Sequence, residues 1–563
     1  MNIFELRIAE RISEKYESLS FDEILNALEK PKNENFGDKS LPCFKFAKQL
    51  RKSPQMIGDE FLSIFTGDDY FSEITNAGGF LNFRFNRTVF VKNMIDSLQN
   101  GNFDRNIKTL GEGKVLAIDF SSPNIAKEFH IGHLRSTAIG NAISNIYAEA
   151  GWKVNRINHL GDWGTQFGKL LYAYIEWGNE EEFKKHPIRY LQQIYVKFHK
   201  LAETDTSLED KGREWFKRLE DGDVKARELW ELFRFHALES LKKSYKRLDI
   251  EFDYFWGEAF YEDACKDVIK LVEESEAGSI SQGALVINLD DYDMPPCLIR
   301  KSDGTSIYAT RDLAAAIHRY NELKFNKFIY VTEMKQNLHF KQVMKSLELL
   351  GFEWAKSMEH VFFGSIKGIS TRKGNVKYLD DVFDEAKERA LSVINEKNPD
   401  LNNKDEIAEK IGIGAVVFQD LSKSRVKDSE FDWERILAFE GETGPYVQYT
   451  YVRMHNILEK IGEYALADST DYSVLTDDDS FRVLTEIGRF KEVIEFAIND
   501  NEPSVIANYL ITLSKAFNKF YLSNRVMGEA ESIMNSRIIL LLNLKNIMAK
   551  CMNILGVPVI EKM

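Results

Sequence analysis

The sequence is poor in the features that mark secreted and membrane proteins. Its 563 residues hold only four cysteines, Cys43, Cys265, Cys297 and Cys551, and no two of them stand at a short paired spacing. This distribution indicates neither a disulfide framework nor a cysteine-based zinc site. No uninterrupted apolar run reaches membrane-spanning length, and the first residues mix acids and bases without the apolar centre of a signal peptide. We therefore expect a cytoplasmic protein without a membrane partner.

Basic residues are outnumbered by acidic ones. The chain has 74 lysines and arginines against 88 aspartates and glutamates, which gives a net charge of −14. This balance argues against nonspecific nucleic-acid binding, although an acidic enzyme can still carry a local basic surface. The length predicts about three or four domains rather than a single core.

The patterns along the chain predict three domains. Residues 1–110 combine helical spacing with a strand-like alternation at 78–85, which predicts a small α+β domain. The Asn-Gly stretch at 100–106 is typical of a linker. Strand signals fade from about 404, and residues 431–563 predict an all-α helical bundle.

Residues 111–430 alternate apolar runs with helical spacing. The candidate strands read "KVLAIDF", "KVNRINHL", "ALVINL", "KFIYVT" and "HVFFGSI". A charged helical insertion occupies about 180–277. This alternation predicts the α/β class, with a doubly wound, mostly parallel, Rossmann-like sheet. Ligands of such sheets bind where strands end and helices begin, so the loop after the first strand is the candidate site.

That loop contains two of the chain's 10 histidines. The segment "SSPNIAKEFHIGHLRS" (121–136) places His130 and His133 around an Ile-Gly pair at an expected helix start. Zinc would need further ligands that no nearby cysteine supplies, and two histidines that merely pack would also suit a helix start. A helix N-terminus can bind phosphate, Gly132 lets a flat group such as adenine approach, and imidazoles can donate to phosphoryl oxygens. The position directly after a strand favours ATP.

In this setting the segment resembles a known family. His-Ile-Gly-His is the signature of class I aminoacyl-tRNA synthetases, and the longer string is similar to the form found in arginyl-tRNA synthetases. Other segments agree in the same order along essentially the whole chain: "INHLGDWGTQFGKL", "KSDGTSIYATRDLAAAIHRY", "QNLHFKQV", "TRKGNVKYLDDV" and "ETGPYVQYTYVRM".

The resemblance implies a ligase of protein synthesis. It would activate L-arginine with ATP to arginyl-adenylate and pyrophosphate, and then transfer the arginyl group to the 3′-terminal adenosine of tRNA(Arg). Mg²⁺ would enter with ATP, and neither zinc nor an organic cofactor would be needed. A monomer is expected.

The resemblance also assigns roles to single residues. His130 and His133 would stabilise the ATP phosphates, and Pro123 and Gly132 would contribute to ATP binding. Six residues would form the pocket for the substrate arginine: Asp119, Ser122, Asn124, Tyr308, Asp312 and Gln336. A carboxylate suits a guanidinium because the two groups form parallel hydrogen bonds.

Two of these assignments have structural alternatives. Asp312 could instead be a carboxylate that stabilises the N-terminus of a helix. Tyr308 could be a core residue of an apolar strand.

One feature of the family is missing. Class I enzymes usually carry a Lys-Met-Ser-Lys-Ser-like loop whose lysines meet the ATP phosphates, and the matching stretch at 368–374 has lost both lysine positions. Arg372 and Lys373 stand nearby, and Lys127 precedes His130 by three residues. We expect Lys127, alongside Arg372 or Lys373, to act as the catalytic cation.

The outer domains would bind tRNA by the same resemblance, the N-terminal one at the elbow near the D-loop and the C-terminal one at the anticodon. The candidate contacts are Tyr446, Gln448, Tyr449, Arg453 and Met563. Aromatic faces beside a guanidinium suit unstacked bases, although a helix that packs these aromatics into a bundle explains them equally well.

Two further classes of function stay open. One is a tRNA-binding relative without catalysis, against which the intact His130, Gly132 and His133 argue. The other is a nucleotidyltransferase that uses no tRNA, which would leave the helical C-terminal domain unexplained.

Overall fold

The computed structural model describes residues 3–31, 33–125, 129–302, 307–367, 378–462 and 470–563. The chain forms two compact units. One unit contains Met1–Ile107, Thr450–Glu495 and Tyr509–Ala549. The other contains Lys108–Tyr449, Phe496–Asn508 and Lys550–Met563.

The second unit is built on a parallel sheet, as the strand–helix alternation predicted. Its order is β10-β9-β4-β5, and all of its pairings are parallel. The strands are β4 (Val115–Asp119), β5 (Lys153–Ile157), β9 (Lys327–Glu333) and β10 (Met358–Phe363). Four of the five predicted strands correspond to these elements.

Helices cover both faces of this sheet. Ala117, Phe328 and Tyr330 belong to one apolar core together with residues of α14 (Tyr308–Leu323) and α15 (Asn337–Leu349). Side chains alternate across a strand, so their neighbours face the opposite side, where α7 (Ile131–Glu149) packs. This two-sided burial explains why the strands read as continuous apolar runs.

The fifth predicted strand does not join the parallel sheet. "ALVINL" contains β7 (Ala284–Ile287), which lies between β6 (Gly278–Ser281) and β8 (Cys297–Arg300) in a separate antiparallel sheet. Gln282 and Gly283, the two residues between β6 and β7, have φ values of 50° and 81°. Positive φ at both positions is the mark of a tight hairpin turn, so a local antiparallel partner prevails over a crossover connection.

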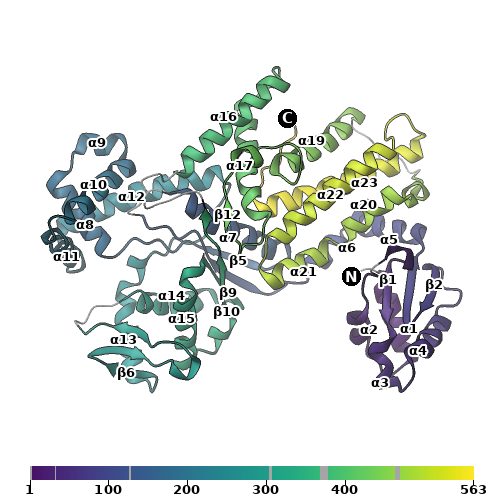
Figure 1. The fold of residues 1–563 in the computed structure, drawn as a ribbon, viewed down its shortest axis with the longest axis horizontal. Helices are drawn as coiled ribbons and strands as arrows, with labels where there is room; N and C mark the ends of the chain where they lie inside the picture. The colour runs from purple at the N-terminus through teal and green to yellow at the C-terminus, as the bar shows by residue number, and fades with distance from the viewer. Residues whose placement is uncertain (1–2, 32, 126–128, 303–306, 368–377, 463–469) are drawn as a thin grey trace. The chain divides into compact units, whose positions relative to one another are not determined.

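The predicted insertion at about 180–277 corresponds only in part to a helical bundle on the sheet domain, because α13 (Glu262–Glu274) packs on α14 in the apolar core instead. Figure 1 shows α8, α9, α10 and α11 gathered together, with α12 running from them towards the sheet. Their bounds are α8 (Thr165–Trp177), α9 (Glu180–Lys185), α10 (Pro187–Ala202), α11 (Ser207–Glu220) and α12 (Val224–Arg247). The Arg247 guanidinium, at the end of α12, donates to Asp380 and Asp384 of α16 (Leu379–Lys397) and to Glu409 of α17 (Lys404–Leu421).

The N-terminal segment is an α+β domain, as expected. Its antiparallel sheet has the order β1-β3-β2, and its main helices pack against it. These elements are α1 (Ile3–Lys15), α2 (Phe21–Ala27), β1 (Lys39–Pro42), α4 (Pro54–Ile64), β2 (Phe71–Ala77), β3 (Phe80–Phe85) and α5 (Arg87–Gln99). Leu81, Phe83 and Phe85 are buried on β3, which matches the alternation seen in the sequence.

The prediction of a linker at 100–106 is wrong. The chain turns at Gly101, where φ is 74°, and enters the helix α6 (Asn102–Lys108), whose Ile107 is buried. The apolar anchor stabilises a helix that the polar residues around it do not suggest.

From residue 431 onward the described chain contains helices without strands. They are α18 (Trp433–Ile436), α19 (Gly444–Ile461), α20 (Asp478–Gly488), α21 (Phe490–Asp500), α22 (Ser504–Ser523) and α23 (Glu531–Leu555). By length and composition α23 could cross a membrane, but 61% of its apolar window is buried inside the protein. Just before this region, β12 (Ser429–Glu430) pairs with β11 (Ile366–Lys367).

Candidate active site

The two histidines of the signature cap the helix that they begin. His130 is the N-cap of α7, and its Nδ1 accepts the backbone N–H of Gly132 at 3.1 Å. His133 Nδ1 in turn accepts the backbone N–H of His130 at 3.1 Å. A ring nitrogen that accepts carries no proton, so a neutral imidazole in this arrangement holds its proton on Nε2. In both neutral rings Nε2 is therefore the atom that is able to donate a hydrogen bond.

Packing fixes the orientation of the two rings. The His130 and His133 rings stack with centroids 3.9 Å apart, and Phe129 stacks on His133 at 5.2 Å. A Cβ at Gly132 would lie 2.8 Å from Cε1 of His130. The position of the His130 ring therefore favours glycine at residue 132, independently of any ligand.

The residues proposed to replace the loop lysines lie outside the described part of the chain. This applies to Lys127, Arg372 and Lys373. Tyr378 is the first described residue after Arg372 and Lys373, and it forms an antiparallel bridge with His130. The N–H of Leu379 donates to Phe129 O at 3.0 Å. The start of α16 is therefore joined to the backbone of Phe129 and His130.

Asp119 ends the central strand in a buried ion pair. Its Oδ2 lies 2.8 Å from Nη1 of Arg319 on α14, and both side chains are at most 5% exposed. Ser122 Oγ donates to Asp119 Oδ1 at 2.6 Å and accepts the backbone N–H of His159 at 3.1 Å. Burial alone would lower the pKa of Arg319, but Tyr261 and Asp119 raise it above its ordinary value. The negative charge of Asp119 is therefore already paired with Arg319. Asp119 also contacts Ser122, another predicted pocket residue.

Pro123 and Asn124 are held by backbone contacts. Pro123 is buried, and its carbonyl accepts the N–H of Gly161 at 3.1 Å. Asn124 forms a parallel bridge with Gly161, where an added Cβ would come within 3.1 Å of Asn124 Cα. The "HLGDW" stretch after β5 thus aligns the loop that precedes the histidines.

Asp312 is paired with a histidine that the sequence analysis did not select. His339 Nε2 on α15 lies 2.6 Å from Asp312 Oδ2. Burial alone would raise the pKa of Asp312, but the hydrogen bond and charge of His339, with His159 and Arg319 nearby, lower it. Burial likewise lowers the pKa of His339, and the contact with Asp312 raises it above its usual range. Asp312 thus lies inside a charged cluster, in the second turn of its helix.

Tyr308 and Gln336 both lie at the start of a helix with exposed side chains. Tyr308 is the first residue of α14 and is 61% exposed, so its placement in an apolar strand is wrong. It begins a helix because the preceding Ile307 is extended and Thr310 caps the first turn. Gln336 is exposed at the N-cap of α15. Both side chains are accessible.

Glu258 lies close enough to Asp312 to feel its charge, and no pattern in the sequence singled it out. Burial raises its pKa to about 8, with like charges on Asp312, Asp162 and Glu262 adding to the effect of burial and Arg311 opposing it. Within the described part of the chain, its shielded Oε2 has no hydrogen-bond partner. Unpaired buried carboxylates are rare and cluster at functional sites. Its signal in the sequence, "WGEAFY", contains no recognisable spacing; only folding places it near Asp312.

The five predicted tRNA contacts differ in accessibility. Tyr449 is 47% exposed, and the guanidinium of Arg453 lies 4.5 Å from the ring centre of Tyr521. Gln448 is fully buried, and its amide nitrogen Nε2 donates to Lys410 O and Pro558 O. Its side chain therefore holds the C-terminal segment.

Tyr446 and Met563 complete this set. Tyr446 N–H donates to Thr443 Oγ1 at 3.2 Å, which fixes the first turn of α19. Met563 O accepts a hydrogen bond from Asn398 Nδ2 at 3.3 Å, so the last residue is anchored at the end of α16. Tyr521, whose ring lies beside Arg453, could not be paired with it from the sequence, because the two residues are remote along the chain.

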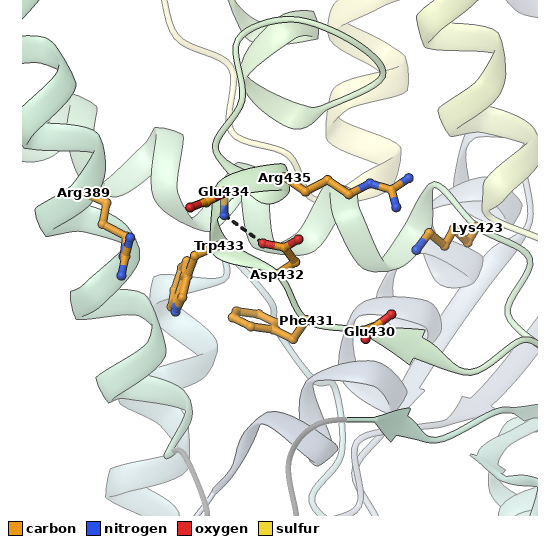
Figure 2. A pocket seen from close by; sticks show the side chains of 8 residues that line it. All are labelled: Arg389, Lys423, Glu430, Phe431, Asp432, Trp433, Glu434 and Arg435. Carbon is orange, nitrogen blue, oxygen red and sulfur yellow. Dashed lines mark hydrogen bonds between the residues drawn. The ribbon is translucent and has the colours of Figure 1, made fainter.

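A separate cavity of about 550 Å³ lies beside β12 and α18 (Figure 2). Arg389 lies with its guanidinium 5.1 Å from the ring centre of Trp433, and Phe431 meets Trp433 edge-on. The charged lining residues are Arg389, Lys423, Arg435, Glu430, Asp432 and Glu434. Equal numbers of cations and carboxylates give this cavity no net charge, and it contains none of the predicted site residues. In the described ranges no group of three or more His, Cys, Asp or Glu side chains could hold a metal ion.

The Arg319–Asp119 pair should be essential for stability. Arg319→Met leaves the Asp119 carboxylate buried without its cation, so we expect the free energy of unfolding to fall by about 3–5 kcal/mol. Urea unfolding followed by circular dichroism measures the change. Lys270→Met, which removes a solvent-exposed pair with Glu274, is the control and should leave the unfolding midpoint unchanged. An Arg319→Met midpoint equal to that of the unaltered protein would show that the pair is dispensable.

Comparisons with known proteins agree with this architecture. Family models match residues 95–433 (tRNA synthetases class I (R), catalytic domain), 447–563 (DALR anticodon binding domain) and 5–85 (Arginyl tRNA synthetase N terminal domain). The arginine–tRNA ligase of Alkaliphilus metalliredigens is 43% identical over 567 residues and that of Halothermothrix orenii 44% over 565, each covering 100% of both chains. The arginyl-tRNA synthetase structures of Thermus thermophilus and Plasmodium falciparum cover 100% of this chain and 99% of their own, at 24% identity and TM-scores of 0.82 and 0.80. The chain belongs to the arginyl-tRNA synthetase family of class I synthetases.

Proposed function

We propose that this chain is an arginine–tRNA ligase. It activates L-arginine with ATP to arginyl-adenylate and pyrophosphate, and it transfers the arginyl group to the 3′-terminal adenosine of tRNA(Arg). The observation that carries this function is the 43% identity to a curated arginine–tRNA ligase over the full length of both chains. The histidine cap after the central strand supplies the physical basis for the ATP step.

In the activation step, the carboxylate of arginine attacks the α-phosphate of ATP. His130 and His133 donate from Nε2 to phosphoryl oxygens, since their Nδ1 atoms accept backbone N–H groups. Such preorganised donors need no reorientation as charge builds up, and no covalent enzyme intermediate is required. Mg²⁺ enters as part of the ATP complex. Pro123 and Gly132 border the nucleotide.

Further positive charge for the phosphates comes from three residues, Lys127, Arg372 and Lys373. Lys127 precedes His130 by three residues, and Arg372 and Lys373 stand within the altered loop. Lys127 takes the place of the missing loop lysine.

The arginine side chain is bound among carboxylates. Glu258 has a raised pKa because its charge is buried near Asp312 and Asp162, and a guanidinium would relieve that repulsion. His339 occupies Oδ2 of Asp312, and the second oxygen of a carboxylate can still accept from a guanidinium. Tyr308 and Gln336 border the same region as accessible polar side chains.

The α-amino and carboxylate groups of arginine meet the loop after β4. Ser122 and Asn124 contact them directly. Asp119 acts through Ser122, because its own charge is paired with Arg319.

Three domains share the work on tRNA(Arg), with boundaries at 1–110, 111–430 and 431–563. The N-terminal domain binds the tRNA elbow near the D-loop, where Phe44 and Phe80, 51% and 37% exposed, form an edge-on pair that suits an unstacked base. The C-terminal domain binds the anticodon through Tyr446, Tyr449, Arg453 and Met563, together with Tyr521. The enzyme acts as a cytoplasmic monomer.

Charging assays test the function directly. The purified chain should attach arginine to tRNA(Arg) in the presence of ATP, and each of the other standard amino acids should give no acid-precipitable product above background. Charging with a different amino acid, or none with arginine, would refute the proposal.

Asp312→Asn should damage the use of arginine far more than that of ATP. It removes the anionic partner of both His339 and the substrate guanidinium, and truncated buried charge pairs cost about 2–5 kcal/mol. We expect kcat/KM for arginine to fall accordingly while KM for ATP stays close to that of the unaltered enzyme. Asp263→Asn on the surface of α13 (Glu262–Glu274) is the control. A near-normal arginine KM and kcat in Asp312→Asn would place the pocket elsewhere.

Arginine binding should release a proton from Glu258. In the free site the pKa of Glu258 is about 8, so the group is mostly protonated at pH 7. A bound guanidinium lowers that pKa, and affinity therefore rises with pH by about tenfold per unit until it levels off above pH 8. Isothermal titration calorimetry in buffers of different ionisation enthalpy measures the proton count. Glu258→Gln should abolish the release, and a pH-independent affinity in the unaltered enzyme would contradict the assignment.

A further inference from the structure

The helical insertion contributes Tyr245 to the interior of the catalytic domain. Tyr245, near the end of α12, is 2% exposed. Its hydroxyl lies 2.8 Å from Ser121 Oγ and accepts a hydrogen bond from Asn158 Nδ2 at 2.8 Å. Ser121 follows the central strand, and Asn158 follows its neighbour β5, so the tyrosine joins the ends of two strands.

The donors and acceptors of this cluster form a chain with one direction. Thr137 Oγ1 donates to the carbonyl of His133 at 2.8 Å, which uses its only hydrogen. Ser121 Oγ, 2.7 Å from Thr137 Oγ1, must therefore donate to it. The Tyr245 hydroxyl must then donate to Ser121. The chain runs from Asn158 through Tyr245, Ser121 and Thr137 to His133, and burial raises the pKa of Tyr245, which keeps its proton in place.

The chain stabilises a backbone conformation that serine rarely adopts. Ser121 and Ser122 have φ values of 68° and 41°, two successive left-handed residues that are not glycine. Such residues persist where the surroundings enforce them, and they cluster at functional sites. Ser121 is enclosed on both sides, since its N–H also donates to Ser136 Oγ at 3.0 Å. Ser122 Oγ is consequently directed at Asp119 and at the N–H of His159.

The ring of Tyr245 supports the same region from a second direction. It meets the ring of Phe129 edge-on at 5.6 Å, and Phe129 stacks on His133. One side chain of the insertion thus contacts both the serine turn and the aromatic stack of the signature histidines. The hydroxyl contacts the serine turn, and the ring contacts the aromatic stack.

We propose that Tyr245 is a positioning residue for arginine: its hydroxyl holds the left-handed Ser121–Ser122 turn and thereby presents Ser122 and Asn124 to the amino-acid substrate. This inference rests on the proposed function and deepens it. The insertion is then part of the arginine site, although it lies far from the signature in sequence.

Tyr245→Phe tests the role of the hydroxyl, because the ring and its contact with Phe129 remain. It leaves the buried Asn158 amide without its acceptor and Ser121 without its donor, so we expect KM for arginine to rise about tenfold, equivalent to about 1.4 kcal/mol. KM for ATP should change by less than about twofold, as the histidine cap is untouched. Both constants are measured by tRNA charging with the full-length chain.

Tyr147→Phe is the matched control. Tyr147 lies on α7, is 1% exposed, and donates its hydroxyl hydrogen to Asn501 Oδ1 at 3.0 Å, away from the serine turn. Like Tyr245→Phe, the Tyr147→Phe substitution removes a buried hydrogen bond, so any general loss of stability appears in both variants. KM for arginine should change only in Tyr245→Phe. Equal changes in the two variants, or equal changes in the arginine and ATP constants, would mean that Tyr245 serves stability alone.

Ser121→Ala is a second variant that keeps the proposal testable if Tyr245→Phe does not fold. It interrupts the same chain one step later, so it should raise KM for arginine in the same way, and the double variant should be no worse than the stronger single one. Wild-type arginine KM in Ser121→Ala or Tyr245→Phe, in an enzyme that charges tRNA(Arg), would overturn this inference and leave the proposed function intact. An unaltered enzyme that does not use arginine would overturn both.

Discussion

The ion pair between Asp119 and Arg319 is the interaction on which the site depends. It joins the carboxyl end of the central strand β4 to α14 in an environment with at most 5% exposure. The strand end leads into the serine turn and the histidine cap, and α14 also carries Tyr308 and Asp312. One buried contact therefore connects the element proposed to bind ATP with the element proposed to bind arginine. A buried charge without its partner is costly, so the two elements hold one relative position.

The signature histidines combine a structural and a chemical task in the same rings. Through Nδ1 they accept backbone N–H groups at the start of α7, which would otherwise lack partners inside the helix. This use of Nδ1 assigns the proton of each neutral ring to Nε2. The cap thereby determines which nitrogen of the imidazole can donate to a phosphate. Gly132 belongs to this device, because a Cβ there would strike the ring of His130.

Several carboxylates gather around Glu258 in the catalytic domain. The like charges of Asp312, Asp162 and Glu262 act on Glu258 and raise its pKa, in addition to the effect of burial. Asp312 is charged because His339 pairs with it, whereas the pKa of Glu258 rises to about 8 through burial and like charge. A cationic ligand would relieve repulsion of this kind, which is the physical basis of the proposal that arginine binds here.

Local patterns were enough to predict the parallel sheet, the small α+β domain, the helical C-terminal region and the position of the histidines after a strand, because periodicity and strand–loop–helix order are properties of neighbouring residues. Some local features were still misassigned: "ALVINL" formed its own hairpin sheet, 100–106 became a helix around buried Ile107, and Tyr308 began a helix. Local patterns gave no information where distant segments meet. The partners of Asp119, Asp312 and Ser121 are Arg319, His339 and Tyr245, each far away along the chain. Hydrogen bonds and ion pairs depend on distances in space, which only tertiary packing decides.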